Sequence, residues 1–226
     1  MRKMFLILLV FVFMGGVAMA APILPDGYEW SSASYFTVTD DSTVADGSIF
    51  SMILEENAAY ESDFGIYYLN NDEILRYEIF SYDQEPSSTL LPTSQTVYFQ
   101  LDSGVWSVSK DNLEWTDFSK NFGFYFGVHT DGMNTDGNAD YYYYTDNSLN
   151  IPNSEVGIDH IKIAFDGLSN IILYLDDQLF ADADRDFNDM IVFVNDVAPV
   201  PEPGALLLLG AGVAGLALYR RRSMNK

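Results

Sequence analysis

The middle of this chain consists of short stretches in which apolar and polar residues alternate, or in which β-branched and aromatic residues follow one another. These stretches predict strands at 34–39, 48–54, 64–69, 74–80, 96–101, 105–109, 122–128, 141–145, 160–165, 171–175 and 190–194. Turn-forming clusters such as Asn70-Asn71-Asp72, Asp102-Ser103-Gly104 and Asp166-Gly167 separate them. Many short strands at about ten-residue spacing predict an all-β fold, an antiparallel, jelly-roll-like β-sandwich.

The stretch 74–80 has the clearest alternation. It predicts Ile74, Arg76, Glu78 and Phe80 on one face of a strand, with Leu75, Tyr77 and Ile79 on the other. No window of twelve or more residues keeps a helical period, and the best candidate for a short helix is 55–62.

The first twenty residues have the pattern of a secretory signal peptide. Arg2 and Lys3 precede an apolar core over 4–13, and Ala18 and Ala20 satisfy the small-residue rule for signal peptidase. We therefore expect cleavage before Ala21, the alternative being an uncleaved anchor.

The end of the chain contains Pro201-Glu202-Pro203, an apolar stretch over 204–219 and the cluster Arg220-Arg221-Arg222. Sixteen residues make a helix of about 24 Å, slightly shorter than the hydrocarbon core, and snorkelling arginines offset the difference. The pattern predicts a short transmembrane helix at 204–219 and a basic cytoplasmic tail at 220–226.

In its order and position this tail resembles the PEP-CTERM sorting signal of Gram-negative bacteria. The resemblance implies recognition by an exosortase, a membrane transpeptidase that cleaves near Pro201, Glu202 and Pro203. It also implies an inner-membrane anchor before processing, and then the cell surface or the extracellular matrix. A plain C-terminal membrane anchor is the alternative, and both place the body outside the cytoplasm.

The body of the chain is strongly acidic. Between Ala21 and Pro201 five basic residues stand against 32 acidic ones, a formal charge of −27. Such a field repels nucleic acid and attracts divalent cations, so we exclude a nucleic-acid partner. We expect a loose lead-in at 21–44, one domain at 45–196 and a stalk at 197–203 that carries the Pro-Glu-Pro motif.

Two acidic clusters are candidate calcium sites, because Ca²⁺ takes six to eight oxygen ligands. The first comprises Asp176, Asp177, Asp182, Asp184, Asp186, Asn188 and Asp189. The second and weaker one comprises Asp131, Asn134, Asp136, Asn138 and Asp140. Neither has the glycine and glutamate spacing of an EF-hand. Solvated acidic turns are the alternative for both, with Arg185 pairing within the first.

The run 184–189, Asp-Arg-Asp-Phe-Asn-Asp, follows the acidic pair Asp176-Asp177 and the strand 160–165. Together with "FGIYYLNN" at 64–71 it resembles DUF4114, a family of secreted bacterial domains. The resemblance covers roughly 45–196 and implies a β-rich exported domain, but no biochemical activity. Where this family has a glycine-rich lead before the motif, this chain has Leu179-Phe180-Ala181.

These observations favour an exported, exosortase-sorted, non-enzymatic surface or matrix protein with a calcium-stabilised β domain. The main alternative is a module that binds exopolysaccharide, with Tyr141 or Tyr143 stacking on sugar rings. A carboxylate-dependent hydrolase is a third hypothesis, but no pair of carboxylates stands out as catalytic. Phe187 is expected to turn into the core, and His160 to be a strand-end residue and not a base.

Overall fold

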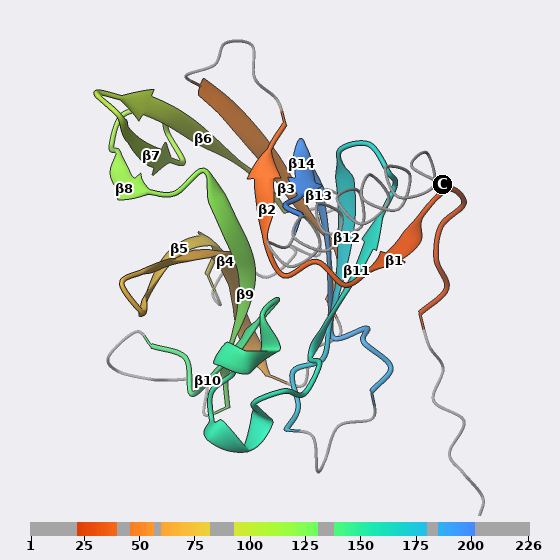
Figure 1. Ribbon diagram of the computed structural model, residues 1–226. Coiled ribbons are helices and arrows are strands. Elements are labelled where there is room, and N and C mark those ends of the chain that lie inside the picture. The colour runs from red at the N-terminus through yellow and green to blue at the C-terminus, as the bar shows by residue number, and fades with distance from the viewer. Residues whose placement is uncertain are drawn as a thin grey trace, which may run out of the picture.

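The computed structural model describes residues 22–39, 46–56, 60–81, 93–130, 138–179 and 185–201 (Figure 1). In these residues the fold is all-β, as predicted, with fourteen strands in two antiparallel sheets. Two short 3₁₀-helices, η1 (Asn147–Leu149) and η2 (Asn153–Glu155), lie between strands.

The larger sheet has eight strands in the order β1-β11-β12-β13-β3-β6-β7-β8. Their bounds are β1 Glu29–Ser31, β11 Ile161–Phe165, β12 Asn170–Leu175, β13 Met190–Asn195, β3 Asp46–Glu56, β6 Ser94–Asp102, β7 Val105–Ser109 and β8 Thr116–Phe118. The hairpin β6–β7 turns through Ser103 and Gly104, both with positive φ. Two such residues are what a two-residue hairpin loop needs, so the predicted turn is confirmed.

The smaller sheet has the order β14-β2-β9-β4-β5. Its strands are β14 Val197–Pro199, β2 Phe36–Val38, β9 Asn121–His129, β4 Glu61–Asn70 and β5 Glu73–Phe80. A sixth strand, β10 (Tyr141–Tyr144), pairs with the second half of β9, while β2 pairs with its first residues. Asn71 and Asp72, again with positive φ, form the predicted turn between β4 and β5.

The inner faces of the two sheets share one hydrophobic core. Ile49, Val97 and Leu173 of the larger sheet belong to the same buried cluster as the aromatic side chains of the smaller one. Phe64 and Phe124 stack with ring centroids 5.8 Å apart at the centre. Two sheets that bury their inner faces against each other form a sandwich, which is the predicted architecture.

Strand β5 follows the predicted alternation as far as Ile79. Tyr77 packs against the core, whereas Ile74 lies on the outer face of the smaller sheet with a tyrosine cluster. Phe80 was predicted on the outer side but is fully buried beside Phe64. The register shift between Phe64 and Gly65 leaves one extra residue on β5, and this bulge returns Phe80 to the core.

Three predictions about local structure are wrong. In its described residues the stretch 55–62 is not a helix, because Glu55 and Glu56 end β3 and Glu61 begins β4. The lead-in is not loose, because β1 and β2 belong to the two sheets. The first half of the stalk is strand β14, whose Val197 is fully buried. In each case pairing with a distant strand outweighs the local sequence signal.

The predicted signal peptide at 1–20, with Ala18 and Ala20, and the predicted helix at 204–219 lie outside the described residues, as do Arg220, Arg221 and Arg222. Within the described residues, no helix has the length and apolar character needed to cross a membrane.

Candidate functional site

The first acidic cluster lies at one end of the hairpin formed by β12 and β13. Leu175 pairs with Met190, so Asp176, Asp177 and Asp189 lie close together where the two strands end. Their side chains are buried, with Asp177 at 0% exposure. Asp182 and Asp184 belong to the loop between them and lie outside the described residues.

Backbone amides hold these three carboxylates. Asp189 Oδ2 accepts from the Asp177 N–H at 2.7 Å, and Asp177 Oδ2 accepts from the Tyr60 N–H at 2.9 Å. Asp176 Oδ1 accepts from the Gln178 N–H at 3.2 Å. Hydrogen bonds to a buried carboxylate offset part of the cost of removing it from water. They also fix the orientation of the three acids.

Two further predicted ligands occupy a different place. Asp186 and Asn188 line a groove of about 390 Å³ on the outer face of the larger sheet, together with Tyr174 and Phe187. Asp186 Oδ1 accepts from the Asn188 N–H at 3.2 Å, as in a local turn. The predicted cluster therefore divides into a buried part and an outer part.

Phe187 is buried but is not part of the main core, which corrects the prediction. It packs with Ala164, Ile172 and Tyr174 in a smaller cluster on the outer face of the larger sheet. The Lys162 Nζ lies 3.9 Å from the centre of its ring. Phe187 has a positive φ of 58°, a conformation that is costly for a bulky residue and that burial of the ring offsets.

Only the last two residues of the second acidic cluster are described, Asn138 and Asp140; Asp131, Asn134 and Asp136 lie outside. Asn138 is exposed, whereas Asp140 is half-buried. Asp140 Oδ2 accepts from both the backbone N–H and the hydroxyl of Thr130, each at 2.8 Å. In this structure Asp140 closes the loop between β9 and β10.

Within the described part of the chain, no three His, Asp or Glu side chains are grouped as a metal site requires. The described carboxylates at the hairpin end therefore do not form a calcium site by themselves.

Two buried histidine–carboxylate pairs were not predicted. His160 Nε2 lies 2.9 Å from Glu155 Oε2, and His129 Nε2 lies 2.8 Å from Asp63 Oδ2. All four side chains are almost completely buried. A signal was present for the second pair, since Asp63 precedes an otherwise apolar strand that must be buried.

His160 is more than a strand-end residue. Its ring stacks on Tyr143 with centroids 3.7 Å apart, and its Nδ1 lies 3.3 Å from the carbonyl oxygen of Asp176. Burial lowers the pKa of His160 below its ordinary value, although Glu155 opposes this shift. With 2% of its surface exposed, His160 does not present a general base to solvent.

The tyrosines predicted to bind sugar lie on β10. Tyr143 is completely buried against His160, so it cannot stack on a ligand. Tyr141 is half-buried and packs against the main core. The tyrosine stretch is thus part of the packing of the domain.

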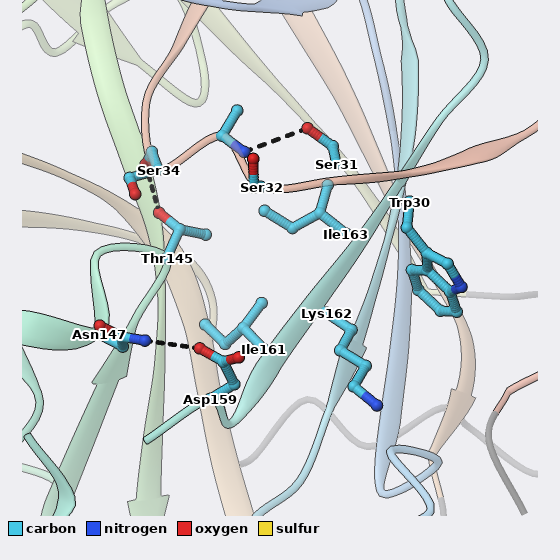
Figure 2. Close-up of a pocket in the computed structure, with 11 residues that line it drawn as sticks. Trp30, Ser31, Ser32, Ser34, Thr145, Asn147, Asp159, Ile161, Lys162 and Ile163 are labelled. Atoms are coloured by element: carbon cyan, nitrogen blue, oxygen red, sulfur yellow. Dashed lines mark hydrogen bonds between the residues drawn. The ribbon is translucent and has the colours of Figure 1, made fainter. Parts of the chain in front are cut away.

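A groove of about 470 Å³ lies elsewhere, at the edge of the larger sheet where β1 ends (Figure 2). Trp30, Asp159 and Lys162 line it together with Asn147 and the serine-rich segment 31–34. Sequence analysis did not single out these residues, because 31–34 and 145–147 come together with β11 only in the folded sandwich.

Comparison with known proteins finds one match. Residues 199–222 match the PEP-CTERM protein-sorting motif, which covers the Pro-Glu-Pro tripeptide, the apolar stretch and the arginine cluster. No curated protein and no solved structure matches the chain. The chain is therefore an exported protein that an exosortase processes, of the kind found in Gram-negative bacteria.

Proposed function

We propose that the chain is a non-enzymatic protein of the cell surface or extracellular matrix, with a β domain that calcium stabilises. Signal peptidase, exosortase and the inner membrane are its partners during export. The body is proposed to be a DUF4114-like domain with jelly-roll-like strand order, on the strength of residues 184–189 and of the β-sandwich.

The observation that carries the calcium proposal is the burial of Asp176, Asp177 and Asp189 at the foot of an acidic loop. Each of these buried carboxylates is costly unless hydrogen bonds and positive charge compensate it. The body has only five basic residues against 32 acidic ones. A divalent cation with oxygen ligands is the natural counter-charge, and Asp182 and Asp184 would complete its ligand set.

The non-enzymatic part of the proposal is supported by the burial of both histidine–carboxylate pairs. Their side chains have little contact with solvent, so a substrate does not reach them in this conformation. Exopolysaccharide binding is the second candidate function. It is favoured by the groove beside Trp30, and not by Tyr143.

Thermal unfolding of the full chain in mild detergent tests the calcium proposal. We expect Ca²⁺ at a hundredfold excess over Kd to stabilise the domain by about 2.7 kcal/mol relative to EDTA. For a domain of this size that raises Tm by about 5–10 °C. The control is Mg²⁺ at the same ionic strength. Because Mg²⁺ requires a stricter octahedral geometry than Ca²⁺, we expect it to raise Tm less.

Two variants make the test specific. Asp184→Asn removes a proposed ligand and should abolish most of the calcium-dependent shift. Asp117→Asn removes an exposed aspartate of β8 and should leave the shift unchanged. Equal shifts with Ca²⁺ and Mg²⁺, or no shift with either, would refute the calcium proposal while leaving sorting by exosortase intact.

A further inference from the structure

The groove beside Trp30 is bounded by segments from both sheets. Ser31 pairs with Ile163, and beyond this point the chain leaves β11 and crosses toward β2. Thr145 and Asn147, which follow β10 of the smaller sheet, lie on the opposite wall (Figure 2). The edge of β11 at Ile161 and Lys162 therefore faces a space of about 470 Å³, within the size range of small-molecule sites.

Trp30 provides a fixed aromatic surface at one end of the groove. Its ring meets Tyr174 edge-on, with centroids 5.7 Å apart and planes at 64°. Tyr174 is itself buried in the outer cluster, so the indole is supported from one side. Nevertheless, 46% of the Trp30 surface is exposed. An indole that is held at its edge and partly exposed offers apolar area for contact with a ligand.

Hydrogen-bonding groups at the other end are already oriented. Asn147 Nδ2 donates to Asp159 Oδ1 at 2.6 Å, which holds both side chains in place. Each side chain has a second polar atom, Asn147 Oδ1 and Asp159 Oδ2. Thr145 is held in the same way, because its hydroxyl donates to the Ser34 carbonyl oxygen at 2.6 Å. Ser32, an exposed residue, adds a hydroxyl on the wall formed by the segment 31–34.

We propose that this groove binds a neutral saccharide chain, with one sugar ring stacked on Trp30 and hydroxyl groups hydrogen-bonded to Asn147 and Asp159. A sugar ring has a face of C–H groups that packs on an aromatic ring, and a rim of hydroxyls that both donate and accept. The groove has these two surfaces on opposite sides. The proposal rests on the second candidate function and specifies its ligand class and contact residues; it does not depend on calcium.

The net negative charge of the chain favours a neutral saccharide over an anionic one as the ligand. The chain has a formal charge of −22, and Asp159 lies in the groove. Lys162, whose ammonium lies over the Phe187 ring, supplies one positive charge to the lining of the groove, and Asp159 supplies one negative charge. A polymer with a carboxylate or sulfate on every unit would be repelled by this surface.

Affinity electrophoresis of the full chain tests the proposal. The probes are four neutral polysaccharides embedded in the gel: a soluble cellulose derivative, laminarin, dextran and mannan. We expect at least one to retard the protein. Trp30→Ala should weaken that binding about tenfold or more, as loss of a central aromatic contact does. Asp159→Ala should also weaken it, because it removes an oriented acceptor.

The matched control is Trp115→Ala, which removes a half-buried tryptophan outside the groove and should leave the retardation unchanged. Thermal unfolding of each variant separates a lost contact from a lost fold. Trp30→Phe keeps an aromatic surface and should retain part of the binding. Absence of retardation by all four polymers overturns the proposal, and so does retardation that Trp30→Ala leaves at the wild-type level.

Discussion

Several titratable side chains are buried next to one another at the loop end of the sandwich. Glu155 and His160 are a hydrogen-bonded pair with little solvent contact, and Tyr143 stacks on the imidazole. Burial raises the pKa of the Tyr143 hydroxyl, and the nearby negative charges of Glu155 and Asp176 add to the rise. Burial therefore favours the neutral forms of the imidazole and of the phenol at this point.

This requirement makes stability depend on pH through His160. The folded-state pKa of His160 lies below 6.5, so the unfolded chain takes up a proton first as pH falls. The contribution of His160 to the free energy of unfolding is then expected to be constant above pH 6.5. It should decrease as pH falls from 6.5 to the depressed folded-state pKa.

Urea denaturation at pH 7.5 and 5.5 measures the effect. The variant His160→Gln lacks the titrating group and should lose less stability than wild type over this interval. At pH 7.5 it should be less stable by about 1–3 kcal/mol, because the hydrogen bond to buried Glu155 is perturbed. Carboxylates titrate in both proteins, so the difference isolates His160. Equal losses in the two proteins would show that His160 does not govern this dependence.

Among the elements, β4 and β9 form the centre of the smaller sheet and rely on glycines for close packing. A Cβ at Gly65 would overlap the Tyr77 carbonyl oxygen and lie 2.6 Å from Tyr125 Cε1. A Cβ at Gly123 would overlap the Tyr67 ring. At Gly127 the nearest atom would be the Ala139 Cβ, 3.0 Å away. The tyrosine layer on the outer face thus packs directly onto the glycine backbone.

A graded loss of stability is expected from alanine at these positions. Gly65→Ala should cost about 2–3 kcal/mol, because a backbone oxygen cannot move aside without breaking the pairing of β4 with β5. Gly127→Ala should cost about 1 kcal/mol or less, because side chains can adjust by a few tenths of an ångström. Urea denaturation at unchanged m-value measures both. A larger loss at Gly127 than at Gly65 would contradict this account of the packing.

For the whole molecule the dominant feature is the formal charge of −22. Self-repulsion of this size opposes the compact state, and salt screens it over about 10 Å at 0.1 M. We expect Tm of the full chain in EDTA to rise with added NaCl. A charge-reversed variant, Glu114→Lys with Asp117→Lys, changes two exposed residues and should show a smaller rise. An unchanged Tm across the salt series would show that the repulsion is already compensated within the fold.

The class of fold and the export of the chain follow from its sequence alone. Every strand predicted from alternation and turn chemistry exists, because side-chain direction and turn conformation are local properties. The sorting motif is likewise linear and was recognised from the order of Pro201, the apolar stretch and the arginines. The sequence also showed which acidic residues are close in the chain, but not which are buried together.

Tertiary structure decided everything that depends on pairs distant in the sequence. The three-residue strands β1, β8 and β14 have weak local signals and are ordered only by their partners. Likewise, Asp63 meets His129 across 66 residues, and the groove beside Trp30 joins segments more than 110 residues apart. The alternation of apolar and polar residues shows on which face of a strand a residue lies, but not which distant residue it contacts. The buried pairs and the groove beside Trp30 therefore exist only where the two sheets pack together.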